Sequence, residues 1–282
     1  MKRASATSSV VRVDRALPRV GLARGGQRYT TAAGSRVSVD KTGDAGVDIP
    51  KLRTVPLLSS LTDDQLALVS HSVEHRRYRA ERPILFAEES ADGLYVILQG
   101  EVKVLIEDAQ GRELVLYILG AGEIFGEVAL FDGQPHSARF DALTSCEILF
   151  IPAAVFSKHV SRNADVLQLL LRVMAHRRRY AHHTIHRLAF MNVYDRVVAT
   201  LIQASAGAHG EWFAGPGCQE IAQTVGATPE MVNRVIRAMI ERGIVRRHSR
   251  KLLIKDRASL CQLCADINGG CRTFAASCLH GA

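Results

Sequence analysis

Residues 219–254 read QEIAQTVGATPEMVNRVIRAMIERGIVRRHSRKLLI, and this stretch decides the fold of the second half of the chain. Gly226 interrupts a short apolar repeat, and the pair Thr228-Pro229 favours the first turn of a new helix. The apolar residues of 231–240 predict one buried face, and residues 244–254 predict two strands around a basic turn. The pattern predicts a winged helix-turn-helix, whose second helix enters the major groove of DNA.

The polar side of that second helix carries the candidate DNA contacts. Arg234 can donate to guanine O6 and N7, and Glu230 can accept from cytosine N4. Residues 161–260 hold 16 Lys and Arg against 7 Asp and Glu, whereas residues 51–160 hold 10 against 16. A basic module beside an acidic one predicts double-stranded DNA as the partner, although Glu230 and Arg234 could instead only pair with each other. The predicted DNA-binding residues are Thr228, Glu230, Asn233, Arg234 and Arg237.

Composition and motifs exclude several classes of protein. The chain has 282 residues, 47% hydrophobic and 23% charged, which is ordinary for a folded protein of one or two domains. No run of 18 consecutive apolar residues occurs, so we predict no transmembrane helix and no membrane partner. Six cysteines and the lack of a signal-peptide pattern favour the cytoplasm. We find no nucleophile elbow, Walker loop or HExxH motif, and we predict that the chain is not an enzyme.

The first 160 residues divide into a polar extension and a run of strands. Residues 1–50 show no persistent period and predict a disordered extension. A transit-peptide-like segment, a start codon further downstream and a basic arm on DNA stay open as alternatives for it. Residues 51–160 contain short alternating strands and a turn at residues 108–111, which is typical of a small barrel or sandwich.

A single long helix is predicted over residues 163–189. Its repeating positions step by four and three residues: Leu167, Leu171, Met174, Arg178, Ala181, Ile185 and Leu188, with Arg178 as a polar break. A helix with two apolar sides packs on its own domain with one side and on a partner with the other, so we predict a symmetric homodimer. The alternative is a helix that lies within a single core.

Three segments together resemble the cyclic-AMP receptor and fumarate–nitrate regulator (CRP/FNR) family. They are Gly126-Glu127-Val128-Ala129-Leu130-Phe131 with Ser137-Ala138, then Leu188-Ala189-Phe190, then Ile221-Ala222 through Arg234. The resemblance implies an α+β fold with an N-terminal cyclic-nucleotide-binding-like β-roll, a long dimerisation helix and a C-terminal winged helix-turn-helix. It also implies a transcription regulator that binds a palindromic operator as a homodimer, is controlled by an effector at the β-roll, and has RNA polymerase as a further partner.

The resemblance assigns effector-binding positions to Gly126, Glu127, His136, Ser137, Ala138, Arg139 and His182. Three departures stand out. His136 replaces the family's nucleotide-binding arginine, with Arg139 as a candidate substitute, and a neutral imidazole has no fixed charge. Ala181 lacks the hydroxyl of an adenine-contacting threonine, and Glu88 or Glu89 takes the place of a turn glycine. A cyclic nucleotide stays one candidate, and weak or no dependence on cyclic AMP is predicted. The effector is otherwise unknown: a different nucleotide, another small effector and an empty roll that serves as a rigid dimer scaffold stay open as alternatives.

These pieces divide the chain into five predicted regions. They are the extension (1–50), the β-roll (51–160), the dimerisation helix and hinge (161–191), the winged helix-turn-helix DNA-binding domain (192–258) and a tail (259–282). The tail contains Cys261, Cys264, Cys271 and Cys278, whose thiolates could hold zinc or an iron–sulfur cluster or belong to a frayed end; no other metal site is predicted. Two alternative functions therefore stay open: a redox- or metal-responsive regulator that uses these cysteines, and an effector-sequestering regulatory subunit that does not bind DNA.

Overall fold

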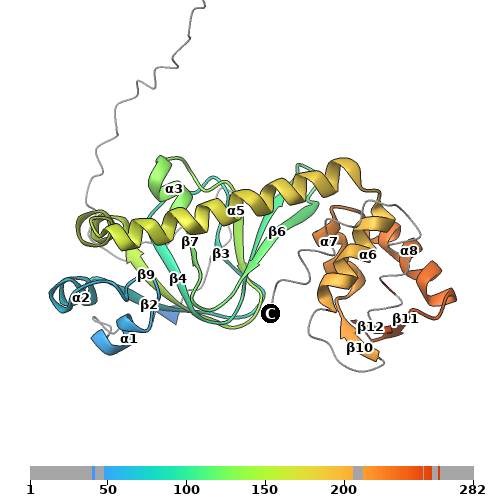
Figure 1. The fold of residues 1–282 in the computed structure, drawn as a ribbon, viewed down its shortest axis with the longest axis horizontal. Coiled ribbons are helices and arrows are strands. Elements are labelled where there is room, and N and C mark those ends of the chain that lie inside the picture. Colours follow the sequence, from blue (N-terminus) through green and yellow to red (C-terminus); the bar gives the residue numbers. More distant parts are fainter. Residues whose placement is uncertain (1–39, 42–47, 206–211, 250, 256–259, 261–282) are drawn as a thin grey trace, which may run out of the picture. The chain divides into compact units, whose positions relative to one another are not determined.

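The computed structural model describes residues 40–41, 48–205, 212–249, 251–255 and 260. Its N-terminal part is a β-roll of two antiparallel sheets, with strand orders β1-β2-β9-β4-β7 and β3-β8-β5-β6 (Figure 1). The strands are β1 (Asp40–Lys41), β2 (Glu74–Tyr78), β3 (Arg82–Leu85), β4 (Gly93–Gln99), β5 (Val102–Glu107), β6 (Glu113–Leu119), β7 (Ile124–Phe125), β8 (Arg139–Ala142) and β9 (Cys146–Pro152).

An aromatic stack forms the centre of the roll. The ring of Phe125 stacks on Tyr95 at 4.9 Å and on Phe140 at 5.0 Å between centroids. Apolar side chains of both sheets surround these rings, as the strand alternation requires. The predicted turn after β5 is present, because the Gly111 N–H donates to the Asp108 carbonyl at 2.9 Å.

Short helices cover one face of the first sheet. They are α1 (Ile49–Arg53), α2 (Asp63–Ser70), α3 (Glu127–Asp132), α4 (Ala153–Val155) and a π-helix (Phe156–Val160). The Thr62 hydroxyl accepts from the Gln65 N–H, and the Gln65 side chain accepts from the Thr62 N–H, so α2 begins with a reciprocal cap. Leucines and valines of α1, α2 and the π-helix pack on β4 and β9 as a second core.

Two short elements fall within residues 1–50, which the sequence predicts to be a disordered extension. Strand β1 pairs with β2, with Asp40 opposite Arg77 and Lys41 opposite Arg76, and α1 begins at Ile49. Without β1, strand β2 would be the edge of the sheet. The free backbone groups of an edge strand can pair with a neighbouring segment of any sequence. The rest of the extension lies outside the described residues.

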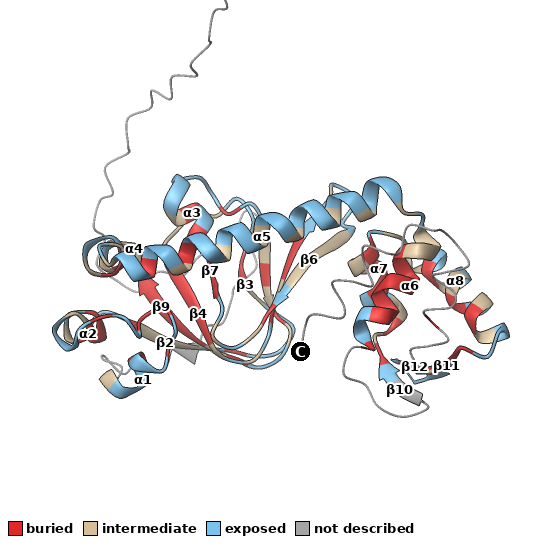
Figure 2. Cartoon of the chain, in the orientation of Figure 1, coloured by how far each residue is buried: buried red, intermediate tan, exposed pale blue. Residues whose placement is uncertain are grey.

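The long helix α5 spans Ala164–Phe190, close to the predicted range. The Asn163 side chain caps it by accepting from the N–H groups of Asp165 and Val166 at 2.9 and 3.2 Å. Val166 and Leu170 are buried in the second core of the roll, which is the first of the two predicted apolar sides. Figure 2 shows most of the remaining surface of α5 as exposed.

A buried arginine holds the turn that follows α5. Arg196 donates to the carbonyl oxygens of Leu188 at 3.3 Å and Met191 at 2.9 Å. Because α5 ends at those carbonyls, the guanidinium satisfies backbone acceptors that the helix itself leaves free. Helix α6 (Val193–Ala204) then starts at the cap residue Asn192, which accepts from the Asp195 N–H.

The C-terminal part is a winged helix-turn-helix. It consists of α6, α7 (Cys218–Val225), α8 (Pro229–Glu241) and a sheet of order β10-β12-β11, with β10 (Trp212–Gly215), β11 (Val245–His248) and β12 (Lys251–Lys255). Gly226 ends α7 at φ +61°, and the Thr228 hydroxyl caps α8 by accepting from the Met231 N–H. Val232, Ile236 and Met239 are buried, so the predicted apolar face is largely confirmed.

Two details of this part differ from the sequence pattern. Met231, predicted to be buried, is exposed, because it lies one helical step from the buried Val232 and turns toward the polar side. Strand β10, which the pattern does not predict, extends the wing on its β12 side. No helix among the described residues is long and apolar enough to span a bilayer.

Candidate functional site

The predicted DNA contacts of α8 gather around one recess. The recess has a volume of about 540 Å³ and is lined by Glu230, Asn233, Arg234, Arg237 and Arg247. Asn233, Arg234 and Arg237 follow Glu230 by three, four and seven residues, so successive turns of α8 bring these four side chains to one face. We call this set the α8 recess. It combines three guanidinium groups with one carboxylate and has the charge of an anion-binding surface.

Thr228 differs from the other predicted contacts, because its side chain caps α8. Its hydroxyl accepts from the Met231 N–H at 3.4 Å. A hydrogen bond from its own backbone N–H and another from Thr228 lower the pKa of the Glu230 carboxyl. Glu230 is therefore an anion at neutral pH and can act only as a hydrogen-bond acceptor.

Arg247 is a member of the α8 recess that the sequence prediction left out. It lies on β11 of the wing, and its Nη2 donates to Oδ1 of Asn233 at 2.7 Å. Val245, two residues earlier on the same strand, is fully buried against the domain core. Alternate strand residues share a face, so the burial of Val245 turns Arg247 toward α8. The alternation of side chains along this strand could have identified Arg247, because it lies two residues after the apolar Val245.

In the β-roll, Gly126 and Glu127 place a buried carboxylate at the start of α3. Gly126 has φ +85°, and a Cβ there would lie 3.0 Å from the Gly93 carbonyl oxygen and 3.1 Å from the Tyr95 ring. Glu127 follows and is only 1% exposed. Arg177 of α5 forms an ion pair with Glu127 and also donates to the Ile124 carbonyl. The sequence prediction missed Arg177, because its partner is 50 residues away.

His136 is buried beside this pair. It is 3% exposed, and its buried Nε2 has no hydrogen-bond partner among the described residues. Burial lowers the pKa of His136, and the nearby carboxylates of Asp92, Glu89 and Glu127 only partly oppose this. The imidazole is therefore neutral at neutral pH.

The loop at Glu88 and Glu89, where the family resemblance implies a glycine, contacts His136 through backbone atoms. The Glu88 N–H donates to the His136 carbonyl, and the His136 N–H donates to the Glu89 carbonyl, both at 2.8 Å. Glu88 has φ +65°, the left-handed conformation that favours glycine. The structure thus places Glu88, rather than Glu89, at the left-handed position of this turn.

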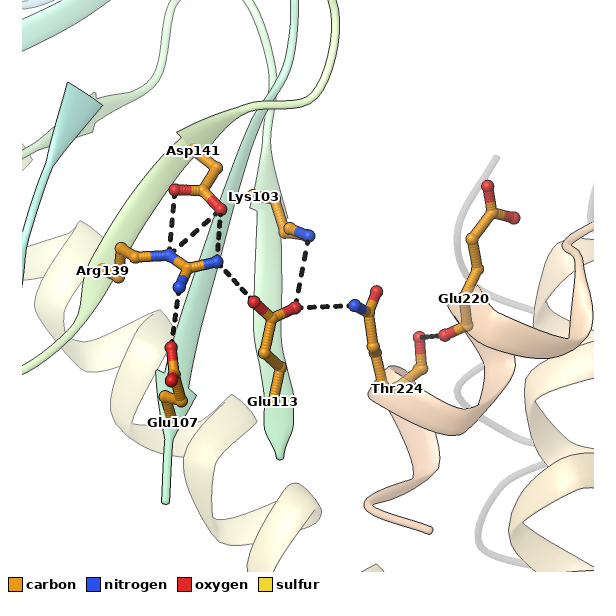
Figure 3. Close-up of polar contacts among 8 residues, drawn as sticks. Lys103, Glu107, Glu113, Arg139, Asp141, Glu220 and Thr224 are labelled. Atoms are coloured by element: carbon orange, nitrogen blue, oxygen red, sulfur yellow. Dashed lines mark hydrogen bonds and ion pairs between the residues drawn. The ribbon is translucent and has the colours of Figure 1, made fainter. Parts of the chain in front are cut away.

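The remaining predicted effector residues have different surroundings. Ser137 is exposed and Ala138 is buried. Arg139 lies in a cluster of carboxylates: it donates to Glu107 at 2.7 Å and Asp141 at 2.9 Å, and it pairs with Glu113 (Figure 3). Burial lowers the pKa of Arg139, and the contacts with Asp141 and Glu113 raise it by more, so the net change is a rise.

Glu113 also links the roll to the helix-turn-helix. Its Oε2 accepts from Nε2 of Gln223 on α7 at 2.6 Å. Lys103 approaches the same oxygen at 3.8 Å. Glu113 is thus shared among Arg139, Lys103 and Gln223, and each of its oxygens has a partner.

His182 is exposed on α5. Cys261, Cys264, Cys271 and Cys278 lie outside the described residues. Within the described part of the chain, no three His, Cys, Asp or Glu side chains gather as metal ligands would.

The outer side of α5 is an exposed apolar strip. Leu171 is 66% and Ile185 is 62% exposed, and the other exposed members are Leu167, Met174 and Leu188. We call these five residues the α5 seam. All five large apolar positions of the predicted seam lie here, and each is at least 37% exposed.

Two family models match the chain. The cyclic nucleotide-binding domain matches residues 75–163, and the Crp-like helix-turn-helix domain matches residues 195–263. The chain is similar to the cAMP-activated global transcriptional regulator Vfr of Pseudomonas aeruginosa, with 35% identity over 63% of this chain and 87% of Vfr. It is also similar to the cAMP-activated global transcriptional regulator CRP of Salmonella typhimurium, with 32% identity over 66% of this chain and 91% of that one.

Solved structures with the same architecture include two bacterial regulators. One is the c-di-GMP responsive global regulator CLP of Xanthomonas campestris, with a TM-score of 0.63 and 25% identity over 69% of this chain and all of that one. The other is a CRP/FNR family transcriptional regulator of Thermus thermophilus, with a TM-score of 0.58 and 26% identity over 68% of this chain and 98% of that one. These matches include both the β-roll and the helix-turn-helix in one chain.

Proposed function

The chain belongs to the CRP/FNR family of DNA-binding transcription regulators, and we propose that it acts as a homodimer that binds a palindromic operator under the control of an effector at the β-roll. The observation that carries the proposal is the α8 recess, where two guanidinium groups and one carboxylate of the helix that such a fold inserts into the major groove lie beside a third guanidinium group, that of Arg247 on the wing. An effector-sequestering subunit would have no use for this face. DNA as the partner also implies action in the cytoplasm.

Each residue of the recess has a proposed role. Arg234 donates to guanine O6 and N7, and the anionic Glu230 accepts from cytosine N4. Arg237 and Thr228, at the two ends of the exposed face, contact phosphates and position the helix without reading sequence. Asn233 lies between them and contacts a base edge.

The α5 seam is the proposed dimer interface. An exposed strip of five large apolar residues costs free energy in water, and a second copy of the same helix buries it with matching spacing. Two copies related by a twofold axis present two α8 recesses to successive major grooves. The optimal operator should then be a palindrome whose half-site centres are about 34 Å apart.

The effector site does not fit cyclic AMP in the way that the family resemblance implies. The phosphate would need a fixed cation, but His136 is buried and neutral, and Arg139 is engaged by three carboxylates. The Glu127 carboxylate, which would accept from a ribose hydroxyl, is engaged by Arg177. We propose an effector other than cyclic AMP, with a hydrogen-bonding group for the unpartnered His136 Nε2. RNA polymerase is the further partner of the DNA-bound dimer.

The test is selection of duplex oligonucleotides by the purified full-length protein, followed by affinity measurements on the enriched site. Arg234→Ala should weaken binding by about 1–3 kcal/mol and relax one base position in each half-site. Lys158→Ala is the control, because Lys158 is an exposed cation of the β-roll and should affect neither sequence preference nor affinity by a comparable amount. Failure of the wild-type protein to enrich any sequence would overturn the proposal.

A further inference from the structure

We propose that two copies of Arg178, facing each other across the proposed dimer interface, form a binding site for an oxyanion that carries two or more negative charges. The inference goes beyond the proposed DNA binding and rests on the proposed homodimer. Its starting point is the one charged position in the repeat that defines the α5 seam. Arg178 falls between Met174 and Ala181 in that repeat and is exposed, as they are.

The apolar strip of α5 is interrupted around Arg178. Large apolar side chains of the seam stop at Met174 and resume at Ile185, which is 11 residues or about 16 Å further along the helix. Between these two residues the repeat contains only Arg178 and the small Ala181. A second α5 that buries both apolar ends of the seam therefore leaves an arginine-lined gap at its centre.

The proposed dimer places the two arginines opposite each other. Each α5 leads directly into α6 of the DNA-binding domain, so two α8 recesses at the same end of the dimer require parallel α5 helices. In a parallel pair, a side chain at this position of the repeat enters a hole formed by four residues of the facing helix. The hole for Arg178 consists of Met174, Arg177, Arg178 and Ala181 of the second copy.

No carboxylate of α5 is close enough to neutralise this hole. The helix has one acidic residue, Asp165, which lies 13 residues before Arg178, or about 20 Å away along the axis. Arg177 is already paired with Glu127, whereas no ion pair among the described residues includes Arg178. The uncompensated charge at the centre of the interface is therefore that of two guanidinium groups, one from each copy.

An oxyanion with two negative charges matches this pair of arginines. Like charges in a partly buried interface repel each other, because the apolar side chains around them displace the water that would screen them. A planar guanidinium can donate two parallel N–H bonds to the oxygens of one phosphate group. The small Ala181 side chains beside the pair leave room for such an ion. Cyclic AMP suits this site poorly, because its phosphodiester group carries a single negative charge.

The experiment measures the dimer dissociation constant of the full-length protein by sedimentation over a concentration series. It compares sodium chloride with sodium phosphate of equal ionic strength, at a pH well above the second pKa of phosphate, so that the ion is mostly divalent. Arg178→Leu replaces the charge by a large apolar residue. Arg179→Leu is the matched control, because it removes the same charge from the adjacent exposed position outside the repeat. Thermal unfolding of each variant checks that the chain remains folded.

Phosphate should lower the wild-type dissociation constant by at least about fivefold relative to chloride, because it binds the dimer and not the monomer. Arg178→Leu should dimerise at least about tenfold more tightly than the wild type in chloride, because a pair of leucines replaces two repelling charges. Phosphate should then have no further effect on this variant. Arg179→Leu should keep the wild-type response to phosphate.

Two sources share this ligand chemistry, free inorganic phosphate and the phosphate chain of a nucleotide. Adenosine triphosphate added to the chloride buffer distinguishes them. A response to inorganic phosphate shows that the free ion is sufficient, and a response to the triphosphate alone would assign the same site to a nucleotide. Cyclic AMP at the same concentration should change the dissociation constant by less than about twofold, because it has one negative charge for two arginines.

Three results would overturn the inference. They are a wild-type dimer that responds to neither phosphate nor the triphosphate, an equal response in Arg178→Leu and the wild type, and an Arg178→Leu dimer that is no tighter than that of Arg179→Leu. Each of them would leave the proposed function intact. A wild-type chain that stays monomeric in every buffer, at the concentrations used for operator binding, would remove the proposed homodimer and this inference with it.

Discussion

Arg139 of the β-roll and Arg177 of α5 have surroundings opposite to those of the arginines in the α8 recess. Arg177 pairs with the buried Glu127, and Arg139 contacts three carboxylates. In the recess, Arg234 and Arg237 are exposed, and Glu230 is the single carboxylate. An arginine is therefore available to an external anion only where the fold has not already supplied a carboxylate. The number of basic residues in a segment does not reveal this.

The reason is the cost of burying charge. A guanidinium that leaves water needs a partner inside the protein, and in the roll the sheet and α5 provide one. Each such pair is then part of the fold, and a ligand that displaced it would have to replace its free energy. The α8 face bears no such cost, because Glu230, Arg234 and Arg237 are exposed to water.

The largest expected effect comes from removing the cation of the buried Arg177–Glu127 ion pair. Arg177→Met leaves Glu127 buried without its partner, and we expect the free energy of unfolding to fall by about 3 kcal/mol. Urea denaturation of the full-length protein measures it. Arg172→Met, an exposed arginine of the same helix, should change stability by less than about 0.5 kcal/mol. A loss of under about 1 kcal/mol for Arg177→Met would show that the pair is not structural.

A charge placed in the α5 seam tests whether a second copy of the chain covers this exposed strip. Leu171→Glu places a charge in the strip, and we expect the dimer dissociation constant to rise at least about a hundredfold, or 2.7 kcal/mol. Sedimentation over a concentration series measures the change. Leu68→Glu on α2, which is 56% exposed and outside the seam, is the control. Equal dimer affinity in Leu171→Glu and the wild type would rule out the seam as the interface.

A titration with cyclic AMP tests whether the roll has a cation that is free to bind the nucleotide phosphate. Saturating cyclic AMP should change operator affinity by less than about tenfold, or 1.4 kcal/mol, because the roll has no uncommitted cation for the phosphate at His136 or Arg139. Arg139→Gln should not change the ratio of the operator affinities measured with and without cyclic AMP. A larger increase in the wild type that disappears in Arg139→Gln would identify Arg139 as the phosphate cation.

The smallest expected effect is a pH dependence of stability. The folded-state pKa of His136 is lowered by burial, so its neutral ring favours folding above the ordinary histidine pKa of about 6.5. As pH falls below that value, the unfolded chain takes up a proton that the folded chain does not, and stability is lost. Unfolding followed from pH 8 to pH 5 should show a shallower decline in His136→Gln. His182→Gln, an exposed histidine of α5, should match the wild type; a decline in His136→Gln as steep as in the wild type would contradict the assignment.

The helix-turn-helix could largely be predicted from the sequence, because the residues that end and start its helices act locally. Gly226, Thr228 and Pro229 act within a few residues, and each has the predicted place at the end of α7 or the start of α8. The period of α5 was equally readable, with Val166 and Leu170 buried on one side and the seam exposed on the other. Strands β1 and β10 were missed, because backbone pairing at a sheet edge leaves little trace in side-chain pattern.

The order of the modules, the polar face of α8 and the apolar period of α5 follow from the sequence alone, because helix caps and residue periods depend on near neighbours. Only the tertiary structure decided which charges are free. Arg177 and Glu127 are 50 residues apart, and Arg139 and Glu107 are 32 apart. Arg247 reaches Asn233 across 14 residues, from the wing to α8. No local rule links residues at such separations, since their contacts exist only after the sheets and helices have packed.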